Sequence, residues 1–196
     1  MEGLKYTDNG LYIEFFPTFL SSLEAEELYN LVVESMIKYK KITPGKRVNF
    51  TFGDAGVSYT VSFGSQTITR VARPWSEYPI LKVYRDRLVA LTGSKTGYNY
   101  VVVQYYPSGK AQISPHRDKE MAPGTDIAGV SVGETRDLVM SPPGYIRGST
   151  PLTISLTDGS LYILKPPTND HWSHSIPRAD TEKGRVSLTY RYVSMS

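Results

Sequence analysis

The sequence predicts an α+β fold: a double-stranded β-helix, or jelly roll, with N-terminal helices packed on one of its sheets. The second half of the chain carries short β-rich segments separated by turn-forming Pro-Ser-Gly, Pro-Pro-Gly and Thr-Asp-Gly sequences, a rhythm that suits two facing sheets. The first half carries two segments with the apolar repeat of amphipathic helices. With 196 residues, 40% of them hydrophobic, the chain suffices for one compact domain with its own core.

The first helix is expected over Ser21 to Lys38. Ser21 and Glu24 have the spacing of a capping box, in which each side chain binds the backbone N–H of the other residue. The apolar positions that follow have the i, i+3, i+4, i+8 spacing of one helix face, so we expect this face to pack on a sheet. They are Leu28, Leu31, Val32 and Met36.

The second helix is expected from about Pro79 to Leu91. Thr92-Gly93 follows directly and supplies the stop, because glycine readily adopts the left-handed conformation in which helices commonly end. One face of this helix is apolar, so it is also expected to cover the core. The residues on that face are Ile80, Tyr84, Leu88 and Leu91.

Strands are expected throughout the remainder of the chain. The Asp158-Gly159 pair lies between two of them and predicts a β-hairpin, because Asp-Gly favours the tight turns that join antiparallel strands. We expect one compact unit, with residues 1–97 as an N-terminal helical extension and residues 98–196 as the jelly-roll core. The expected strands are Tyr98–Tyr106, Ile127–Gly133, Asp137–Ser141, Leu152–Thr157, Ser160–Leu164 and Arg185–Val193.

The composition argues against cysteine chemistry, secretion and a membrane-spanning segment. The chain has no cysteine, which excludes disulfides, thiolate catalysis, iron–sulfur clusters and Cys-ligated zinc, so a metal would need His and carboxylate ligands. The N-terminus has no signal-peptide pattern and the longest apolar stretch, around Tyr100 to Val103, is far too short to span a membrane. We expect a soluble intracellular protein, in nucleus or cytoplasm, and a net charge of +3 permits a polyanionic partner without requiring one.

The candidate catalytic residues begin with the histidines, of which the sequence has three: His116, His171 and His174. His116 lies two residues before Asp118, and on an extended backbone both side chains point to the same side. With a distant second histidine, such a pair forms the two-His-one-carboxylate triad of non-haem Fe(II) oxygenases. The alternative for a His-x-Asp sequence is a surface strand with a chance ion pair.

The last expected strand alternates between two faces. One face carries Arg185, Ser187, Thr189 and Arg191, and the other is apolar. If the polar face looks into the barrel, two buried guanidinium groups need anionic partners, and a dicarboxylate such as 2-oxoglutarate would supply them. The alternative is an edge strand on which both arginines face solvent.

Five sequence blocks occur in a fixed order along the chain, and together they resemble a known family. In order and spacing they are similar to the AlkB family of Fe(II)/2-oxoglutarate-dependent nucleic-acid dealkylases, and to its duplex-DNA repair branch above all. Upstream, Gly53–Thr60 resembles the substrate lid of that branch, so the similarity spans about Phe16 to Val193, and the lid belongs to the N-terminal extension. The blocks are Asn99–Gly109, His116–Glu120, Ile127–Gly133 with Arg136-Asp137, His171–Pro177 and Arg185–Arg191.

The resemblance implies a complete set of metal and co-substrate ligands. His116, Asp118 and His174 would bind Fe(II), with His171 outside the ligand set. The co-substrates would be 2-oxoglutarate and O2, with one arginine at each end of 2-oxoglutarate and their order left open. Gln104 and Ser187 replace asparagines common in the family and keep polar groups able to hydrogen-bond. The implied 2-oxoglutarate-binding residues are Gln104, Tyr106, Arg185, Ser187, Thr189 and Arg191.

The resemblance also implies a substrate side of the site. Glu120 returns to the face of Asp118, where it would contact the exocyclic amine of a target base and favour cationic lesions. Val61 stands where the duplex-DNA branch has an aromatic residue that stacks on the flipped base, so Tyr59 or Phe63 is expected to supply that surface; the alternative is that both are core aromatics. The implied substrate-binding residues are Arg47, Phe52, Tyr59, Val61 and Glu120.

The expected strand preference follows from the segment before Arg47. It is too short for the hairpin that carries an intercalating finger in the duplex-DNA branch, and it offers Lys40, Lys41 and Lys46 for phosphate contacts instead, although such a cluster is often only a solvated loop. Single strands and RNA therefore stay open beside duplex DNA.

The function implied is oxidative demethylation of N1-methyladenine and N3-methylcytosine in DNA repair, releasing formaldehyde, succinate and CO2. We expect a monomer that binds methylated DNA or RNA and no membrane. Two alternatives remain: the same chemistry on RNA, a protein side chain or another substrate, and a jelly-roll binding module without catalysis.

Overall fold

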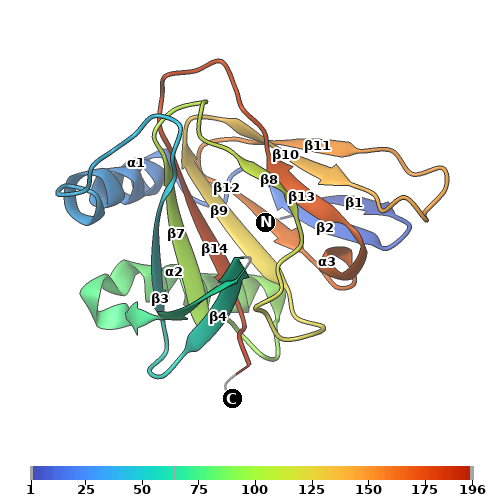
Figure 1. Cartoon of the computed structure of the whole chain (residues 1–196), viewed down its shortest axis with the longest axis horizontal. Helices are drawn as coiled ribbons and strands as arrows, with labels where there is room; N and C mark the ends of the chain where they lie inside the picture. The colour runs from blue at the N-terminus through green and yellow to red at the C-terminus, as the bar shows by residue number, and fades with distance from the viewer. Residues whose placement is uncertain (1, 64, 195–196) are drawn as a thin grey trace.

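Two β-sheets pack face to face in the computed structural model, which describes residues 2–63 and 65–194, with the backbone alone for residues 61–63 (Figure 1). Within this part of the chain, the larger sheet has eight strands in the order β1-β2-β12-β9-β14-β7-β3-β6 and the smaller has four in the order β11-β10-β13-β8. A separate hairpin, β4–β5, projects beside them. The jelly roll predicted from the sequence is confirmed.

The strands of both sheets are short, and their paired neighbours are antiparallel apart from the parallel pair β3–β6. The larger sheet consists of β1 (Leu4–Asp8), β2 (Leu11–Phe16), β12 (Ser160–Leu164), β9 (Ile127–Gly133), β14 (Arg185–Arg191), β7 (Tyr100–Tyr106), β3 (Val48–Gly53) and β6 (Arg73–Pro74). The smaller sheet consists of β11 (Leu152–Leu156), β10 (Arg136–Ser141), β13 (Ser173–Ile176) and β8 (Ile113–His116). The hairpin consists of β4 (Ser58–Phe63) and β5 (Gln66–Val71).

The first predicted helix is present but changes character along its length. It is an α-helix, α1, over Ser22–Leu31 and continues as a π-helix, η1, over Val32–Met36. The predicted capping box between Ser21 and Glu24 is formed. The wider π turn keeps Val32, Met36 and Ile37 all buried against the sheet, which a regular helix running to Lys38 would not do.

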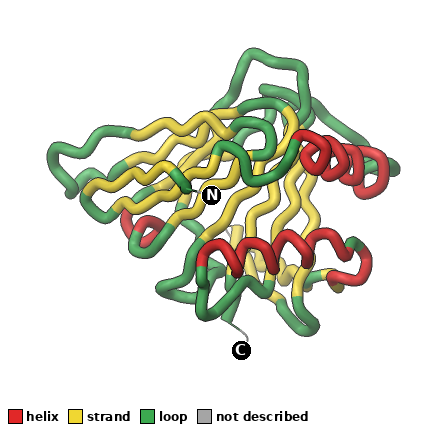
Figure 2. Tube along the Cα trace, turned by 180° about the vertical axis from the view of Figure 1, so that it is seen from behind, coloured by secondary structure: helices red, strands yellow, loops and turns green. Residues whose placement is uncertain are grey.

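The second predicted helix, α2, runs over Pro79–Thr92 and ends at Gly93, whose φ of 63° is the left-handed conformation expected there. Its buried face is Leu81, Tyr84 and Leu88, whereas the predicted Ile80 is exposed and the predicted Leu91 is only partly buried. Figure 2 shows α1 and α2 on the same side of the large sheet, so that side is buried under helices and the other faces the small sheet. The remaining helices are the 3-10 helix η2 (Trp75–Glu77) and the short α3 (Thr168–His171).

The two faces of β14 have different surroundings. Val186, Leu188 and Tyr190 belong to the apolar cluster beneath the helices. The alternating polar residues point into the space between the sheets, and both arginines among them are buried, so the alternative of a solvent-facing edge strand is excluded. Burial of both faces explains why this central strand combines apolar and polar positions without any exposed residue.

The predicted hairpin at Asp158-Gly159 is wrong. Within the described residues β11 pairs with β10 in the small sheet and β12 pairs with β9 and β2 in the large one, so this turn crosses from one sheet to the other. The Asp158 side chain accepts a hydrogen bond from the N–H of Gly133 (2.8 Å), and Gly159 has a φ of 78°. Asp-Gly supplied the positive φ that the sequence indicated, but tertiary pairing decided which strands it joins.

The N-terminal extension contributes strands as well as helices. β1 and β2 form a hairpin about Asn9-Gly10, and β2 pairs with β12 of the core, while β3 pairs with β7. Segments from residues 1–97 and 98–196 thus share the large sheet, which is consistent with the expectation of one compact unit. None of the described helices has the length and apolarity needed to cross a membrane.

Candidate active site

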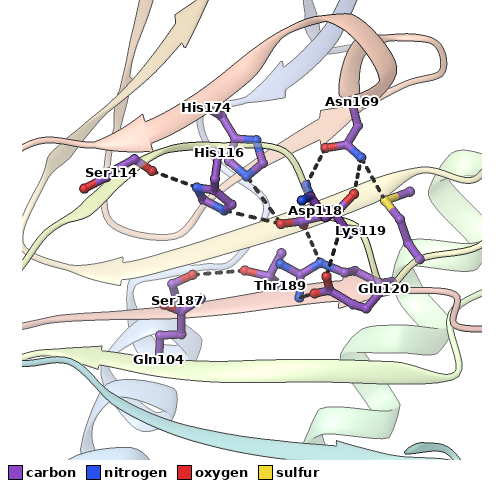
Figure 3. Close-up of polar contacts among 12 residues, drawn as sticks. Gln104, Ser114, His116, Asp118, Lys119, Glu120, Asn169, His174, Ser187 and Thr189 are labelled. Carbon is purple, nitrogen blue, oxygen red and sulfur yellow. Dashed lines mark hydrogen bonds and ion pairs between the residues drawn. The ribbon is translucent and has the colours of Figure 1, made fainter. Parts of the chain in front are cut away.

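Three of the predicted residues, His116, Asp118 and His174, lie close together at the β8 edge of the smaller sheet. His116 ends the edge strand β8 and lies directly across from His174 of β13 in the strand register. Asp118 follows two residues after β8. The Asp118 Oδ1 atom lies 3.3 Å from Nε2 of His116 and 3.9 Å from Nε2 of His174, and the ligand atoms of the three residues all lie within 4.8 Å of one another (Figure 3). The spacing predicted from the sequence therefore gives a compact two-His-one-carboxylate cluster.

The charge on Asp118 is fixed by its surroundings. Burial alone would raise the pKa of the Asp118 carboxyl, but the Arg191 guanidinium and the two imidazoles hold this pKa well below its usual value. Arg191 Nε donates to Asp118 Oδ2 over 2.6 Å, and the pKa of Arg191 is raised by the same carboxylate despite burial. Asp118 is thus ionised, with Oδ1 directed at the histidines and Oδ2 bound to Arg191.

The two histidines differ in their environments. Burial lowers the pKa of His174 to about 4, so this imidazole is neutral at pH 7 and keeps a lone pair for a metal. Burial also acts to lower the pKa of His116, but its hydrogen bonds to Asp118 and to the Ser114 carbonyl outweigh burial and raise it. His116 Nδ1 lies 2.9 Å from the Ser114 carbonyl oxygen, which directs Nε2 toward Asp118. Two imidazoles and one carboxylate are the donor set that suits non-haem Fe(II).

A buried cavity between the sheets adjoins this cluster. Its polar wall contains all six residues that the sequence analysis connected with 2-oxoglutarate, and His116 and His174 border it. Ser187 and Thr189 hydroxyls lie 3.3 Å apart within the wall. The six residues are Gln104, Tyr106, Arg185, Ser187, Thr189 and Arg191.

The two arginines of the cavity have different partners. Arg191 Nε binds Asp118, and its Nη1, which has no hydrogen-bond partner among the described residues, lies 3.5 Å from Glu120, so Arg191 lies at the end of the cavity nearest the His116–Asp118–His174 cluster. Arg185 stacks on the Tyr106 ring at 4.9 Å and donates through Nε to the Ser131 hydroxyl, whereas its Nη1 is buried without a hydrogen-bond partner in the described part of the chain. A buried guanidinium with a free donor at the far end of the cavity fits the second carboxylate of 2-oxoglutarate.

An open cleft of about 390 Å³ lies on the other side of the cluster. Arg47, Tyr59 and Glu120 line it, as predicted for substrate-binding residues, together with His116 and Asp118. Gln104 borders both the cleft and the buried cavity, and its Oε1 accepts a hydrogen bond from Arg47 Nη1 over 2.6 Å. The His116–Asp118–His174 cluster therefore lies where the two spaces meet.

Of the two remaining predicted substrate residues, Phe52 lies elsewhere and the side chain of Val61 lies outside the described residues. Phe52 is fully buried on the helix side of the large sheet, where its ring packs edge-on against Tyr78 at 5.4 Å. This placement corrects the prediction for Phe52, because alternation along β3 turns it away from the cleft. Val61 pairs with Ile68 in the β4–β5 hairpin, but its side chain, like that of Phe63, lies outside the described residues.

Several polar residues around the site were not predicted from the sequence. Ser131, which binds Arg185, is a lone hydroxyl in a buried apolar strand, and that isolation is a signal that could have marked it. Arg70 of β5 also lines the cleft, but the sequence around it offers no distinguishing pattern. Asn169 binds the backbone of Asp118 from a distant segment, and no local pattern could have indicated it.

Comparison with known proteins agrees with this geometry. The family model of the 2OG-Fe(II) oxygenase superfamily matches residues 13–191. The chain belongs to the 2OG-Fe(II) oxygenase superfamily. The His116–Asp118–His174 cluster and the arginine-lined cavity fit the Fe(II) and 2-oxoglutarate dependence of this superfamily. The other histidine, His171, lies apart from the cluster, with its Nδ1 2.9 Å from the Tyr145 hydroxyl.

Similar members of the 2OG-Fe(II) oxygenase superfamily include named demethylases. The chain is 39% identical over 156 residues to the mouse (Mus musculus) protein named DNA oxidative demethylase ALKBH2, covering 75% of this chain and 62% of the relative. It is 37% identical to the human protein of that name, over 76% of this chain and 58% of the relative. It is 30% identical to human alpha-ketoglutarate-dependent dioxygenase alkB homolog 3, over 59% of this chain and 43% of the relative. The chain thus spans about three fifths of the length of the ALKBH2 proteins.

A solved structure, that of OsALKBH1, has the same overall fold as this oxygenase. The two chains superpose with a TM-score of 0.63 over 96% of this chain and 100% of the other, at 13% sequence identity. This likeness supports the jelly-roll assignment alone.

Proposed function

We propose that the protein is an Fe(II)- and 2-oxoglutarate-dependent dioxygenase that oxidatively removes N-methyl groups from nucleic-acid bases. The observation that carries this proposal is the meeting of three features at one point: a two-His-one-carboxylate cluster, a buried arginine-lined cavity and an open cleft. The names of the ALKBH2 relatives support the same activity. DNA alkylation repair is the process we propose for it.

His116, Asp118 and His174 would hold the metal, and the cavity would hold 2-oxoglutarate. We assign Arg191 to the metal-bound end of the co-substrate, because it already contacts Asp118. We assign Arg185 to the distal carboxylate, because no described carboxylate pairs with it, whereas Arg191 lies close to both Asp118 and Glu120. When bound, iron, 2-oxoglutarate and O2 supply the oxidation of an N-methyl group to a hydroxymethyl group, which leaves as formaldehyde while succinate and CO2 are released. The protein binds and orients the reactants and excludes water.

The cleft favours a cationic base attached to a polyanion. Glu120 lines the cleft 3.5 Å from Arg191, and a carboxylate there favours bases that carry positive charge, such as N1-methyladenine and N3-methylcytosine. Arg47, Arg70 and Lys119 line the same cleft and would attract the phosphate backbone. The exposed Lys40, Lys41 and Lys46 extend this positive charge along the chain before β3. Monomeric action stays a prediction.

The test is direct measurement of repaired base and formaldehyde by mass spectrometry. The purified protein is loaded with Fe(II) without oxygen, then aerated with 2-oxoglutarate and matched single-stranded DNA, duplex DNA or RNA carrying N1-methyladenine or N3-methylcytosine. We expect demethylation of DNA, and the ranking of the three strands reports strand preference. His116→Ala should be inactive. His171→Ala is the matched control and should keep activity, because His116 belongs to the cluster and His171 does not.

Other outcomes separate the alternatives. Succinate release without repair of any methylated base would keep the oxygenase and remove the nucleic-acid substrate. Preferential repair of RNA would move the proposal from DNA repair to RNA demethylation. No succinate under any condition would favour a binding module without catalysis.

Replacing Tyr59 is expected to weaken repair more than it weakens 2-oxoglutarate consumption without a methylated base. Tyr59 lines the cleft and packs edge-on against Tyr100, with ring centroids 5.1 Å apart. Loss of a base-stacking ring costs about 1 to 3 kcal/mol, so Tyr59→Ala should lower the repair rate by about 5- to 150-fold. Tyr59→Phe keeps the ring and should stay near wild type. Equal losses of repair and of uncoupled succinate release in Tyr59→Ala would instead assign the ring a structural role.

A further inference from the structure

Asp118 lies outside any regular element, although it belongs to the candidate metal cluster. The edge strand β8 ends at His116, and only His116 and Ile113 pair with β13, with an irregularity between the two pairs. Among the described residues, no backbone group hydrogen-bonds to the backbone N–H or C=O of Asp118. The sheet therefore does not fix the position of this ligand.

One side chain takes the place of the missing strand. The Asn169 Oδ1 atom accepts a hydrogen bond from the N–H of Asp118 over 2.9 Å, and Asn169 Nδ2 donates to the C=O of Asp118 over 2.8 Å (Figure 3). Both backbone groups of Asp118 are thus bound by a single amide, as they would be by a neighbouring strand. Asn169 Nδ2 also lies 3.5 Å from the Met121 sulfur, which keeps the loop after Asp118 close to the amide.

The helix that carries Asn169 is itself firmly attached. The Thr168 hydroxyl accepts from the Tyr12 N–H over 2.7 Å and donates to the Tyr12 carbonyl over 2.9 Å, and Thr168 is fully buried. Arg117 donates to the Asp170 carbonyl, which makes a further link between the ligand segment and α3. The position of Asp118 is therefore set by α3, and through α3 by β2 of the large sheet.

We propose that Asn169 is a positioning residue that fixes the backbone of Asp118 and thereby sets the affinity of the cluster for its metal. The inference rests on the proposed assignment of the cluster as a metal site. Asp118 must present Oδ1 to the metal while Oδ2 stays bound to Arg191. Because Asn169 binds both the N–H and the C=O of Asp118, the backbone of this ligand is held in the position that this arrangement needs. Groups that orient metal ligands typically contribute about 10- to 100-fold to metal affinity.

The chain offers a matched control for this amide. Asn99 Nδ2 donates to the Val193 carbonyl over 2.8 Å, and Asn99 Oδ1 accepts from the Val193 N–H over 2.8 Å, the same two-point bond on a residue that is not a ligand. Asn99 is more deeply buried than Asn169, so its loss should destabilise the fold at least as much. Comparing Asn169→Ala with Asn99→Ala therefore separates an effect on the metal from a general loss of stability.

The experiment is a titration of metal-free protein with Mn(II), without 2-oxoglutarate or nucleic acid, with free Mn(II) measured by electron paramagnetic resonance. Asn169→Ala should weaken Mn(II) binding by about 10- to 100-fold, and Asn99→Ala should stay within about twofold of wild type. Thermal unfolding of each metal-free variant reports the accompanying loss of stability. Asn169→Ser, in which a shorter polar side chain leaves space for water, carries the same test if Asn169→Ala does not fold.

Three outcomes would overturn the inference. They are unchanged Mn(II) affinity in the Asn169 variants, equal losses in the Asn169 and Asn99 variants, and a wild-type protein that does not bind Mn(II), which would also remove the metal assignment. Mn(II) binding that depends on Asn169 in a protein without demethylase activity would keep the inference and refute only the proposed substrate.

Discussion

Asp118→Ala is expected to abolish 2-oxoglutarate turnover and to destabilise the fold. The substitution removes a ligand of the candidate metal cluster and leaves the Arg191 guanidinium buried, with its 2.6 Å partner gone. Removing one member of a buried ion pair typically costs about 3 to 5 kcal/mol. The loss of stability should therefore be visible in urea unfolding of the metal-free protein, and the loss of activity in succinate release.

His116→Ala is the comparison that separates these two effects. The His116 side chain is 32% exposed and no buried charge depends on it alone, so its loss should change the free energy of unfolding by no more than about 1 kcal/mol while still abolishing turnover. Normal turnover in either variant would remove the metal assignment. An Asp118→Ala protein as stable as His116→Ala would show that Arg191 does not need its carboxylate partner in the folded state.

Arg185→Ala is expected to raise the 2-oxoglutarate requirement by on the order of 100-fold, because truncating one partner of a buried, hydrogen-bonded charge pair costs about 2 to 5 kcal/mol. The measurement compares 2-oxoglutarate with 2-oxobutyrate, which lacks the distal carboxylate. Wild type should strongly prefer 2-oxoglutarate, and the variant should lose that preference while using 2-oxobutyrate as poorly as wild type does. An unchanged preference would mean that Arg185 does not bind the distal carboxylate.

Arg136 provides the matched control for Arg185. It is also buried and lies 5.7 Å from the Tyr106 ring, but both of its Nη atoms already donate to backbone carbonyls. Arg136→Ala should lower stability without changing the preference between the two oxo acids. The carbonyls that accept from it are those of Ser108, Gly109, Ala111 and Pro177.

Much of this site follows from patterns that act over a few residues. The i, i+2 spacing places His116 and Asp118 on one side of an extended chain, and alternation along β14 places Arg185 and Arg191 on one face. The second helix could likewise be predicted from its apolar spacing and Gly93. These signals are local, because they depend on backbone periodicity alone.

Other features depend on contacts between distant segments and could not be predicted in this way. The turn at Asp158-Gly159 has local hairpin chemistry, yet the competing partners β10 and β9 divide its flanking strands between two sheets. The pairing of β3 with β7 decides which face of the sheet the Phe52 side chain occupies. The fold brings Asn169 of α3 against the backbone of Asp118, 51 residues earlier in the chain. Asn9-Gly10 is the opposite case, a local turn signal that does join the strands on either side of it, β1 and β2.

The cross-strand position of His116 and His174 makes metal binding a part of folding. β8 is an edge strand held to β13 by two paired positions, and one of these pairs consists of the two histidines themselves. A metal shared by them ties the edge strand to its neighbour and is bound only when the strands are in register, so it draws the population toward the folded chain by mass action. At a free metal concentration a hundredfold above Kd this linkage adds about 2.7 kcal/mol to stability, so the melting temperature of the protein should follow the metal supply of its surroundings.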